Sequence, residues 1–420
     1  MYNDLMITKK LPSGATCYII PKKGYASVQC MVSVRYGAMD MSFTADGQRR
    51  DTPAGAAHFL EHKLFESAPG APGVFETFAR LGAEVNAFTT AASTAYYFMA
   101  TSRAEDCLRA LLDFVCHLHL TDENVEKEKG IITQEIRMYD DDPHWAAHFN
   151  LLEAVYAAHP ARVNIAGTAE SVASLTKETL TDCYDTFYRP SNMAVICAGD
   201  FADADALCDL IDCCIVRKEP LAVTRHYGDE PAGVHKEFAH CVMDVTRPIF
   251  SIGVKDAAVA QSPVDVAAMR VLLDLLCGES SALYADLFAK GWIDEGFYAD
   301  YQTDADLGVS LFAGASDAPQ KVYESILAEI ARMQSSGVDL AAFERLKRKH
   351  IGRFWRGVNS LDAVVPAQCA CFVKGTSLQR MLDAYMQLTR EDIAARLAAF
   401  GGEKQTALSV VEKQPGSAPK

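Results

Sequence analysis

Segments with the two-residue period of strands alternate along the chain with segments of helical period. Apolar, β-branched runs at 16–21 and 28–34 predict strands, and helical patterns follow at 54–65 and 74–81. The other elements expected in this half lie at 85–89, 94–101, 104–118, 124–139, 174–188 and 193–198. Residues 216–234 have no clear period and collect proline and glycine, which predicts a linker.

Beyond this linker the same order of elements begins again, with strands first and long helices later. These elements are expected at 239–245, 249–254, 264–277, 296–302, 309–315, 321–333, 339–355 and 406–411. The repeated order predicts a duplicated α+β unit, with tandem domains at 1–215 and 235–420. The repetition lies in the order of elements, because no sequence motif recurs.

Composition adds one exclusion to this picture. The 420 residues carry a net charge of −15, half of them are hydrophobic and 23% are charged, which is typical of a globular chain with a large core. An acidic chain without clustered Lys and Arg is a poor partner for nucleic acid. Because no 18 apolar residues run together, we also expect no transmembrane helix and no membrane partner.

The thirteen cysteines are scattered through apolar patterns, which favours reduced thiols over a disulfide framework. Residues 1–23 contain no continuous apolar region before a cleavage site, so no signal peptide is expected and the predicted location is the cytoplasm. Two closer groups of cysteines, at 208–214 and 369–371, have no second pair at a spacing that suits zinc, and we interpret them as packing.

His58 and His62 stand four residues apart in a segment of helical period, with Glu61 between them. Residues four apart share one face of a helix, so both imidazoles can bind a single ion. Glu61 can then reach a water in the open position of that ion. This is the inverted form of the zinc-protease helix. It predicts a hydrolytic zinc site in which Glu61 is the general base.

A catalytic zinc ion takes three protein ligands, so the third must come from another segment. The helix expected at 124–139 offers Glu126, Glu128 and Glu135. Glu135 stands nearest the apolar stripe, where a carboxylate must be paired or bound to metal, and it is the favoured ligand. A structural salt bridge is the alternative for Glu135.

With these residues in place, the chain resembles the M16 (pitrilysin/insulysin) family of zinc metallopeptidases. The likeness covers the flanks of the motif at 56–65, the segment 128–136 around the third ligand, and two further stretches at 82–89 and 187–199. Coverage is therefore nearly the full length. Within the family the chain is most similar to the short bacterial members of the processing-peptidase type.

The resemblance implies a role for each matching residue and a fold of two tandem homologous α/β sandwich domains, each with an antiparallel-rich sheet covered by helices. His58, His62 and Glu135 would bind Zn²⁺, Glu61 would be the general base, and Glu128 would orient a ligand histidine. It also implies that Asn86, Ala87 and Phe88 line an edge strand to which a substrate peptide adds by backbone hydrogen bonds. From composition alone, residues 86–88 read as the end of a buried strand.

The second half departs from the family pattern in one respect. Self-sufficient members carry an Arg and a Tyr there, which bind substrate and stabilise the oxyanion, but the matching positions here are near Phe288 and Asp294. No arginine occurs between Arg270 and Arg332, so no shift of register restores the pair. We therefore expect the zinc-bearing subunit of a heterodimer whose related partner supplies the Arg/Tyr pair, although a homodimer remains possible.

The leading hypothesis is a zinc-dependent endopeptidase that acts on short or unfolded peptides. A second hypothesis is a non-catalytic scaffold or assembly subunit that kept the fold, and a third is a zinc hydrolase of non-peptide amides. Zinc content and the effect of Glu61→Gln separate the first two, since a scaffold would neither hold stoichiometric zinc nor depend on Glu61. A substrate screen is needed to exclude the third.

Overall fold

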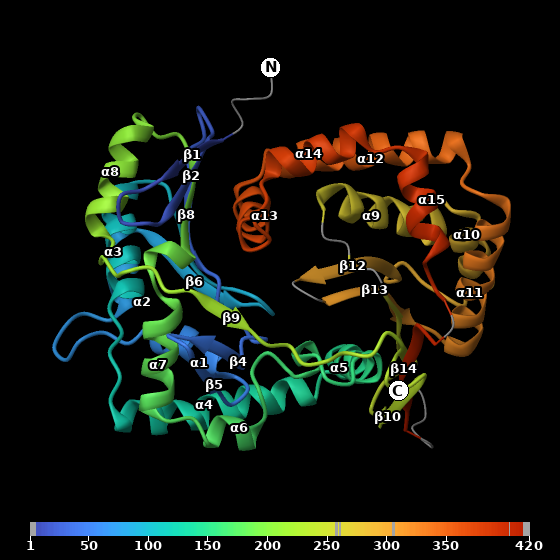
Figure 1. The fold of residues 1–420 in the computed structure, drawn as a ribbon, viewed down its shortest axis with the longest axis horizontal. Helices are drawn as coiled ribbons and strands as arrows, with labels where there is room; N and C mark the ends of the chain where they lie inside the picture. Colours follow the sequence, from blue (N-terminus) through green and yellow to red (C-terminus); the bar gives the residue numbers. More distant parts are fainter. Residues whose placement is uncertain (1–5, 257–258, 260–261, 305–306, 403, 415–420) are drawn as a thin grey trace. The chain divides into compact units, whose positions relative to one another are not determined.

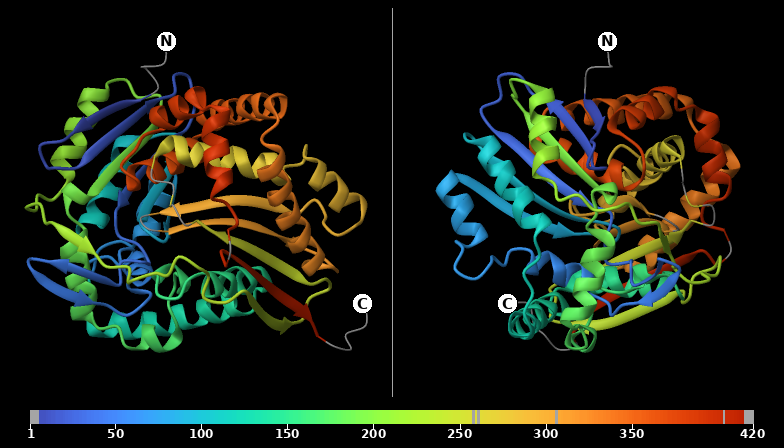
Figure 2. Two further views of the ribbon diagram at one scale, coloured as in Figure 1. Left: turned by 45° about the vertical axis from the view of Figure 1, so that its right-hand side comes forward. Right: turned by 60° about the vertical axis from the view of Figure 1, so that its left-hand side comes forward.

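The computed structural model describes residues 6–414 apart from 257–258, 260–261, 305–306 and 403 (Figure 1). These residues form two compact units, each of which contains a twisted sheet (Figure 2). The first unit is made from 6–136, 164–226 and 356–379, and the second from the other described residues.

The first unit is built on a six-stranded sheet in the order β1-β2-β8-β3-β7-β6. Its strands are β1 (Ile7–Lys10), β2 (Thr16–Pro21), β3 (Val28–Val34), β6 (Ala83–Thr89), β7 (Thr94–Ala100) and β8 (Met193–Gly199). Every pair is antiparallel except β2 and β8, which run parallel. Among the described strands β6 pairs only with β7, so one edge of β6 is free. A small sheet, β5-β4-β9, completes this unit with β4 (Ser42–Ala45), β5 (Gln48–Asp51) and β9 (Val223–Arg225).

Helices cover both faces of the larger sheet. The helices of this unit are α1 (Ala56–Lys63), α2 (Val74–Leu81), α3 (Ala104–Cys116), α4 (Asp122–Asp140), α6 (Ala169–Ala173), α7 (Lys177–Phe187), α8 (Ala204–Cys214) and α13 (Leu361–Val373), with a short 3₁₀ turn at Pro190–Asn192. On one side α3 packs against β7 and β3, and on the other α13 packs against β8 and β3 (Figure 1). Every residue of β8 is buried, as expected for a strand with both faces covered.

The second unit is built on a five-stranded sheet in the order β10-β14-β11-β13-β12. Its strands are β10 (Phe238–Met243), β11 (Ile249–Lys255), β12 (Tyr298–Asp304), β13 (Leu307–Ala315) and β14 (Thr406–Lys413). The helices that lie wholly or mainly in it are α5 (Pro143–Val155), α9 (Pro263–Cys277), α10 (Ala282–Ala289), α11 (Pro319–Ser336), α12 (Leu340–Val358), α14 (Leu378–Gln387) and α15 (Arg390–Ala398), with a 3₁₀ turn at Pro160–Arg162.

The two sheets share one pairing scheme. Strands β2, β8, β3, β7 and β6 correspond in order to β10, β14, β11, β13 and β12, and the one parallel pair falls at the same place in both sheets. The predicted α+β fold with two repeated, antiparallel-rich halves is confirmed. In this correspondence β12 is the equivalent of the edge strand β6.

The units exchange helices relative to the order of the chain. Helix α5, from the first half, packs against β10, β11 and β14, whereas α13, from the second half, packs against the first sheet. Segment 216–234, expected to be a linker, contains β9, which pairs with β4. A division of the chain at that segment would not reproduce the compact units. Residues 137–163 belong to the second unit and residues 356–379 to the first.

Candidate metal centre

Helix α1 places two histidines on one face, and a glycine fixes where the helix begins. Gly55, its N-cap, has φ 89°, and a Cβ there would lie 2.4 Å from the carbonyl oxygen of Ala166, so only glycine fits. Phe59 and Leu60 anchor the opposite side of the helix in the core with no exposed surface. His58 and His62 then lie one turn apart, with ring centroids separated by 4.7 Å.

Glu135 of α4 completes the group. Its two carboxylate oxygens lie 3.6 Å from Nε2 of His58 and 3.4 Å from Nε2 of His62. In the described part of the chain, these three side chains are the only group of three or more potential ligands close enough together to hold one metal ion. Glu126 is exposed and pairs with Lys129 on its own helix, which leaves Glu135 as the carboxylate at this site.

The donor set and its dimensions fit zinc. Two imidazole nitrogens and a carboxylate, with a fourth position left for water or substrate, form the ligand set of a catalytic zinc site. With bonds of about 2.0–2.1 Å, the ligand atoms of a tetrahedral zinc ion lie about 3.3 Å apart. The separations of 3.4 and 3.6 Å between Glu135 and the two histidines are close to that value.

Glu128 lies two turns before Glu135 on the same face of α4 and contacts the second ring nitrogen of His62. Its Oε1 lies 3.0 Å from Nδ1 of His62, and its side chain is almost fully buried. Burial lowers the pKa of His62, but hydrogen bonds to Glu128 and Glu135, with their charges, outweigh it and raise this pKa to about 9. His62 is therefore protonated in the metal-free protein at neutral pH, and a metal ion must displace that proton.

Glu128 is itself held ionised. Burial raises the pKa of Glu128, but its hydrogen bond to His62 and the charge of Lys63 outweigh burial and keep this pKa below its usual range. The ammonium of Lys63 lies 3.1 Å from Oε2 of Glu128. Lys63 was not identified as a site residue from the sequence. The sequence feature that could have indicated it is a lysine between the apolar residues Leu60 and Leu64.

The carboxylate of Glu61 is fixed from the sheet. The hydroxyl of Thr89, the last residue of β6, donates a hydrogen bond of 2.5 Å to Oε2 of Glu61. Thr89 was also missed as a site residue, since its contact depends on how β6 packs against α1. The bond ties the carboxylate to the edge strand.

The three residues expected to receive a peptide lie in the middle and later part of β6. Asn86 is exposed, whereas Ala87 and Phe88 are half-buried, and the ring of Phe88 lies 6.2 Å from that of Tyr97. The backbone N–H of Ala87 donates to the side-chain oxygen of Asn86 at 2.8 Å. This N–H is therefore engaged by the side chain of the preceding residue.

Segment 286–294, where the resemblance would place an Arg and a Tyr, has other contacts in this chain. Phe288 is 46% exposed, and Asp286 pairs with Lys290 at 2.5 Å. Asp294 pairs with Arg247 at 3.0 Å, and the guanidinium of Arg247 also donates to the carbonyl of Gly291. Arg247, from the loop between β10 and β11, thus reaches this segment, but its N–H donors are already used by Asp294 and Gly291.

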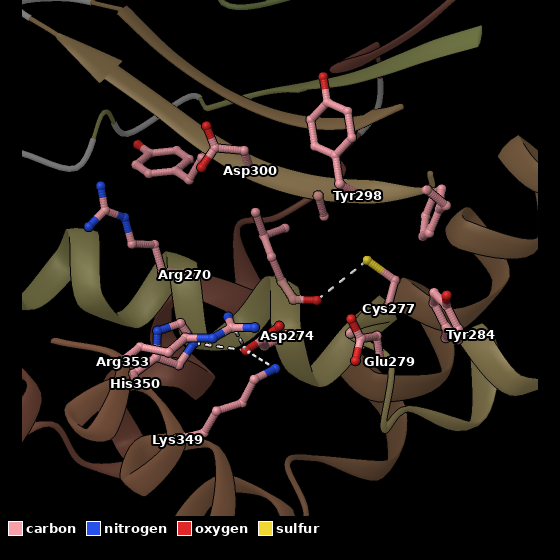
Figure 3. Close-up of a pocket in the computed structure, with 15 residues that line it drawn as sticks. Arg270, Asp274, Cys277, Glu279, Tyr284, Tyr298, Asp300, Lys349, His350 and Arg353 are labelled. Atoms are coloured by element: carbon pink, nitrogen blue, oxygen red, sulfur yellow. Dashed lines mark hydrogen bonds and ion pairs between the residues drawn. The ribbon is translucent and has the colours of Figure 1, made fainter. Parts of the chain in front are cut away.

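The second unit has a cavity beside α9 and β12 that holds an ion-pair cluster. Asp274 of α9 is contacted by Lys349 at 2.9 Å, His350 at 3.0 Å and Arg353 at 3.7 Å, all from α12 (Figure 3). These groups line a cavity of about 310 Å³. An acid of α9 and three basic side chains of α12 therefore pair across one wall of this cavity.

Comparisons with known proteins agree with this geometry. The family model described as "Insulinase (Peptidase family M16)" matches residues 43–169, and "Peptidase M16 inactive domain" matches 174–349. The "Uncharacterized zinc protease YmfH" of Bacillus subtilis (strain 168) is 35% identical over 403 residues, which cover 93% of this chain and 92% of that protein.

A second relative, the "Uncharacterized zinc protease YmxG" of Bacillus subtilis (strain 168), is 27% identical over 76% of this chain and 78% of its own length. Among solved structures, a putative M16-like peptidase from Alicyclobacillus acidocaldarius superposes with a TM-score of 0.93 at 38% identity, covering 97% of this chain and 98% of that one. A protease from Helicobacter pylori shares the fold, with a TM-score of 0.83 at 19% identity, and covers 97% of this chain and 99% of its own. In the described part of this chain, no helix combines the length and apolar character needed to cross a bilayer.

Proposed function

The chain belongs to the M16 peptidase family, and from that premise we propose that it is a zinc-dependent endopeptidase acting on short or unfolded peptides. One observation carries the proposal above the others. His58, His62 and Glu135, on α1 and α4, could hold one metal ion, and Glu61 of α1 is hydrogen-bonded to the edge strand β6. The residues proposed as metal ligands, as the base and as the peptide-binding edge therefore all belong to the first unit.

In this proposal Nε2 of His58, Nε2 of His62 and the carboxylate of Glu135 hold the zinc ion. When bound, zinc acts as a Lewis acid for the scissile carbonyl and lowers the pKa of water toward about 7. Glu128 keeps the proton of His62 on Nδ1, because its Oε1 accepts a hydrogen bond there, and so leaves Nε2 free as a ligand.

Glu61 moves the proton. Its free carboxylate oxygen accepts a proton from the attacking water as the new C–O bond forms, while Oε2 stays on the Thr89 hydroxyl. The same carboxyl then gives that proton to the leaving amine nitrogen as the C–N bond breaks. Glu61 ends the cycle ionised, so no other proton donor is required.

The substrate strand adds to the free edge of β6. A peptide carbonyl replaces the side-chain oxygen of Asn86 as the acceptor for the N–H of Ala87, and Phe88 contacts the peptide from the same strand. Recognition through backbone groups requires an extended, unfolded segment and places few demands on side chains. This favours peptide over non-peptide amides as the substrate class.

The proposal includes a partner. The segment 286–294 offers no free arginine or tyrosine at the positions that the family uses, and Arg247 is engaged with Asp294. One preorganised donor to the oxyanion is worth about 10²–10³ in rate. We therefore propose that a related chain with the Arg/Tyr pair completes the active site. The thirteen free thiols support a reducing compartment such as the cytoplasm.

Zinc analysis combined with Glu61→Gln tests the proposal. The wild-type chain should hold one zinc ion, and the variant should hold the same amount while losing hydrolysis of an unstructured peptide library. The measurement is made with and without a companion chain recovered by pull-down, and the companion should raise the rate about 10²–10³-fold. A wild-type chain that holds no stoichiometric zinc, or a rate independent of Glu61, would instead identify a scaffold subunit.

A further inference from the structure

Lys63, the residue after the second histidine, is the only lysine among the largest fully buried side chains of the described structure. It is the last residue of α1 and has no exposed surface. A buried ammonium is costly unless it is paired and hydrogen-bonded, so its place in the core requires compensating contacts.

Those contacts use every donor of the ammonium. Its Nζ lies 2.9 Å from Oε1 of Glu66, 3.1 Å from Oε2 of Glu128 and 3.2 Å from the backbone carbonyl of Asn124. A lysine ammonium has three N–H donors, and here three acceptors surround it. The head group of Lys63 is consequently held in one position.

Glu128 connects Lys63 to the metal centre. Its Oε2 accepts from Lys63, and its Oε1 lies 3.0 Å from Nδ1 of His62, so both oxygens of one carboxylate are engaged. Because the two contacts use different oxygens, the plane of the carboxylate is fixed, and with it the orientation of the imidazole. In contrast, Nδ1 of His58 has no hydrogen-bond partner among the described residues. Of the two histidines, therefore, only His62 is held through its second ring nitrogen, Nδ1.

We infer that Lys63 is a positioning residue that holds Glu128 against His62 and thereby sets the affinity of the site for zinc. The inference rests on the proposed zinc function of the site. The competing explanation is structural, because Lys63 also ties the end of α1 to the start of α4 through Asn124. Zinc affinity and coupling to Glu128 distinguish the two explanations, since a purely structural contact changes neither.

The experiment measures the zinc dissociation constant, by competition with a chromophoric chelator, for the wild type, Lys63→Met, Glu128→Gln and the double variant. Loss of a residue that supports a metal ligand typically weakens binding about 10–100-fold. We expect a loss in that range for Lys63→Met, and we expect the double variant to bind no more weakly than Glu128→Gln, because both changes break the same link. Lys129→Met is the matched control, since Lys129 pairs with Glu126 on α4 without touching His62, and it should keep wild-type affinity.

Each outcome decides the question. Wild-type affinity in Lys63→Met, or losses that multiply in the double variant, would overturn the inference and leave Lys63 a structural residue. Thermal unfolding of the metal-free variants shows whether each is folded. If Lys63→Met does not fold, Lys63→Gln takes its place in the comparison with Glu128→Gln and the double variant. Glutamine keeps a hydrogen-bond donor near Glu128 but carries no charge. A wild-type chain that binds no zinc refutes the proposed function itself, whereas a failure limited to the variants concerns Lys63 alone.

Discussion

Replacing Asp274 by Asn should weaken the second unit in a manner that depends on pH. Asp274 is the only carboxylate among the described groups that contacts Lys349, His350 and Arg353 at once, and its side chain is 16% exposed. Burial raises the pKa of Asp274, but hydrogen bonds from His350 and Lys349 and their charges outweigh it and lower this pKa to about 2. The amide in Asp274→Asn has no charge to offer these partners.

The size of the effect follows from that pKa. A carboxyl with a pKa of about 2 when folded and about 3.9 when unfolded adds about 2.5 kcal/mol to the free energy of unfolding. Since the folded pKa is the lower one, the whole contribution is present above about pH 4.5, and it is lost as the pH falls through about 4 to 2. The variant should therefore be about 2.5 kcal/mol less stable than the wild type at pH 7, and the difference should shrink below pH 4.

Urea unfolding followed by tryptophan fluorescence measures this difference in the free energy of unfolding for the second unit. All three tryptophans, Trp145, Trp292 and Trp355, belong to the second unit, so their signal reports its unfolding. Asp286→Asn is the control, because its carboxylate is 54% exposed and pairs with Lys290 on a helix surface, where such pairs contribute about 0.5 kcal/mol at most. Equal stability of Asp274→Asn and wild type at pH 7, or a gap that persists undiminished at pH 2, would refute the reasoning.

Two further predictions concern the first unit. Thr89→Val removes the hydroxyl that donates a hydrogen bond of 2.5 Å to Glu61. A hydrogen bond to a charged group contributes about 1.5–3 kcal/mol. Peptide turnover should therefore fall about tenfold or more, with unchanged KM and zinc content. A drop in zinc content would show that Thr89 acts on the ligands instead. Gly55→Ala would place a Cβ 2.4 Å from the carbonyl oxygen of Ala166 at φ 89°, so the unfolding free energy should fall by about 2 kcal/mol or more and zinc binding should weaken. Gly130→Ala is its control. Apart from its chain neighbours and the backbone of its own helix, no atom lies within 4 Å of the added Cβ, so a helical alanine there should be neutral or slightly stabilising.

Local patterns predicted the elements that carry their own signal. Strands β2 and β3 occur where the β-branched runs placed them, and α2 ends at Gly82, which has φ 73°. The helix expected at 124–139 occurs as α4, but no helix was predicted over 143–155. In the structure α5 begins there, because Asp142 caps the helix and Pro143 occupies its first turn.

The grouping of His58, His62 and Glu135 could be anticipated for a similar reason, whereas the contacts of Thr89 and Lys63 could not. The spacing of His58 and His62 is a property of one helix, and Glu135 stands out within its own helix. The contact of Thr89 with Glu61 joins a strand to a helix, and that of Lys63 with Glu128 joins two helices. Both depend on tertiary packing, which no local period records. The domain boundaries, the roles of the site residues and the partner chain stay predictions that the experiments above address.

The exchange of α5 and α13 between the two sheets has a consequence for the history of the chain. A gene duplication normally yields modules that can later be separated, shuffled or lost one at a time. Here each sheet is completed by a helix encoded in the other half of the gene, so a cut in segment 216–234 would leave two incomplete cores. A truncation that keeps only the metal-binding half would expose the buried residues of β8 to water. Because the first sheet needs α13, the second half of the chain is required by the first, even though its described residues contain no group of potential metal ligands.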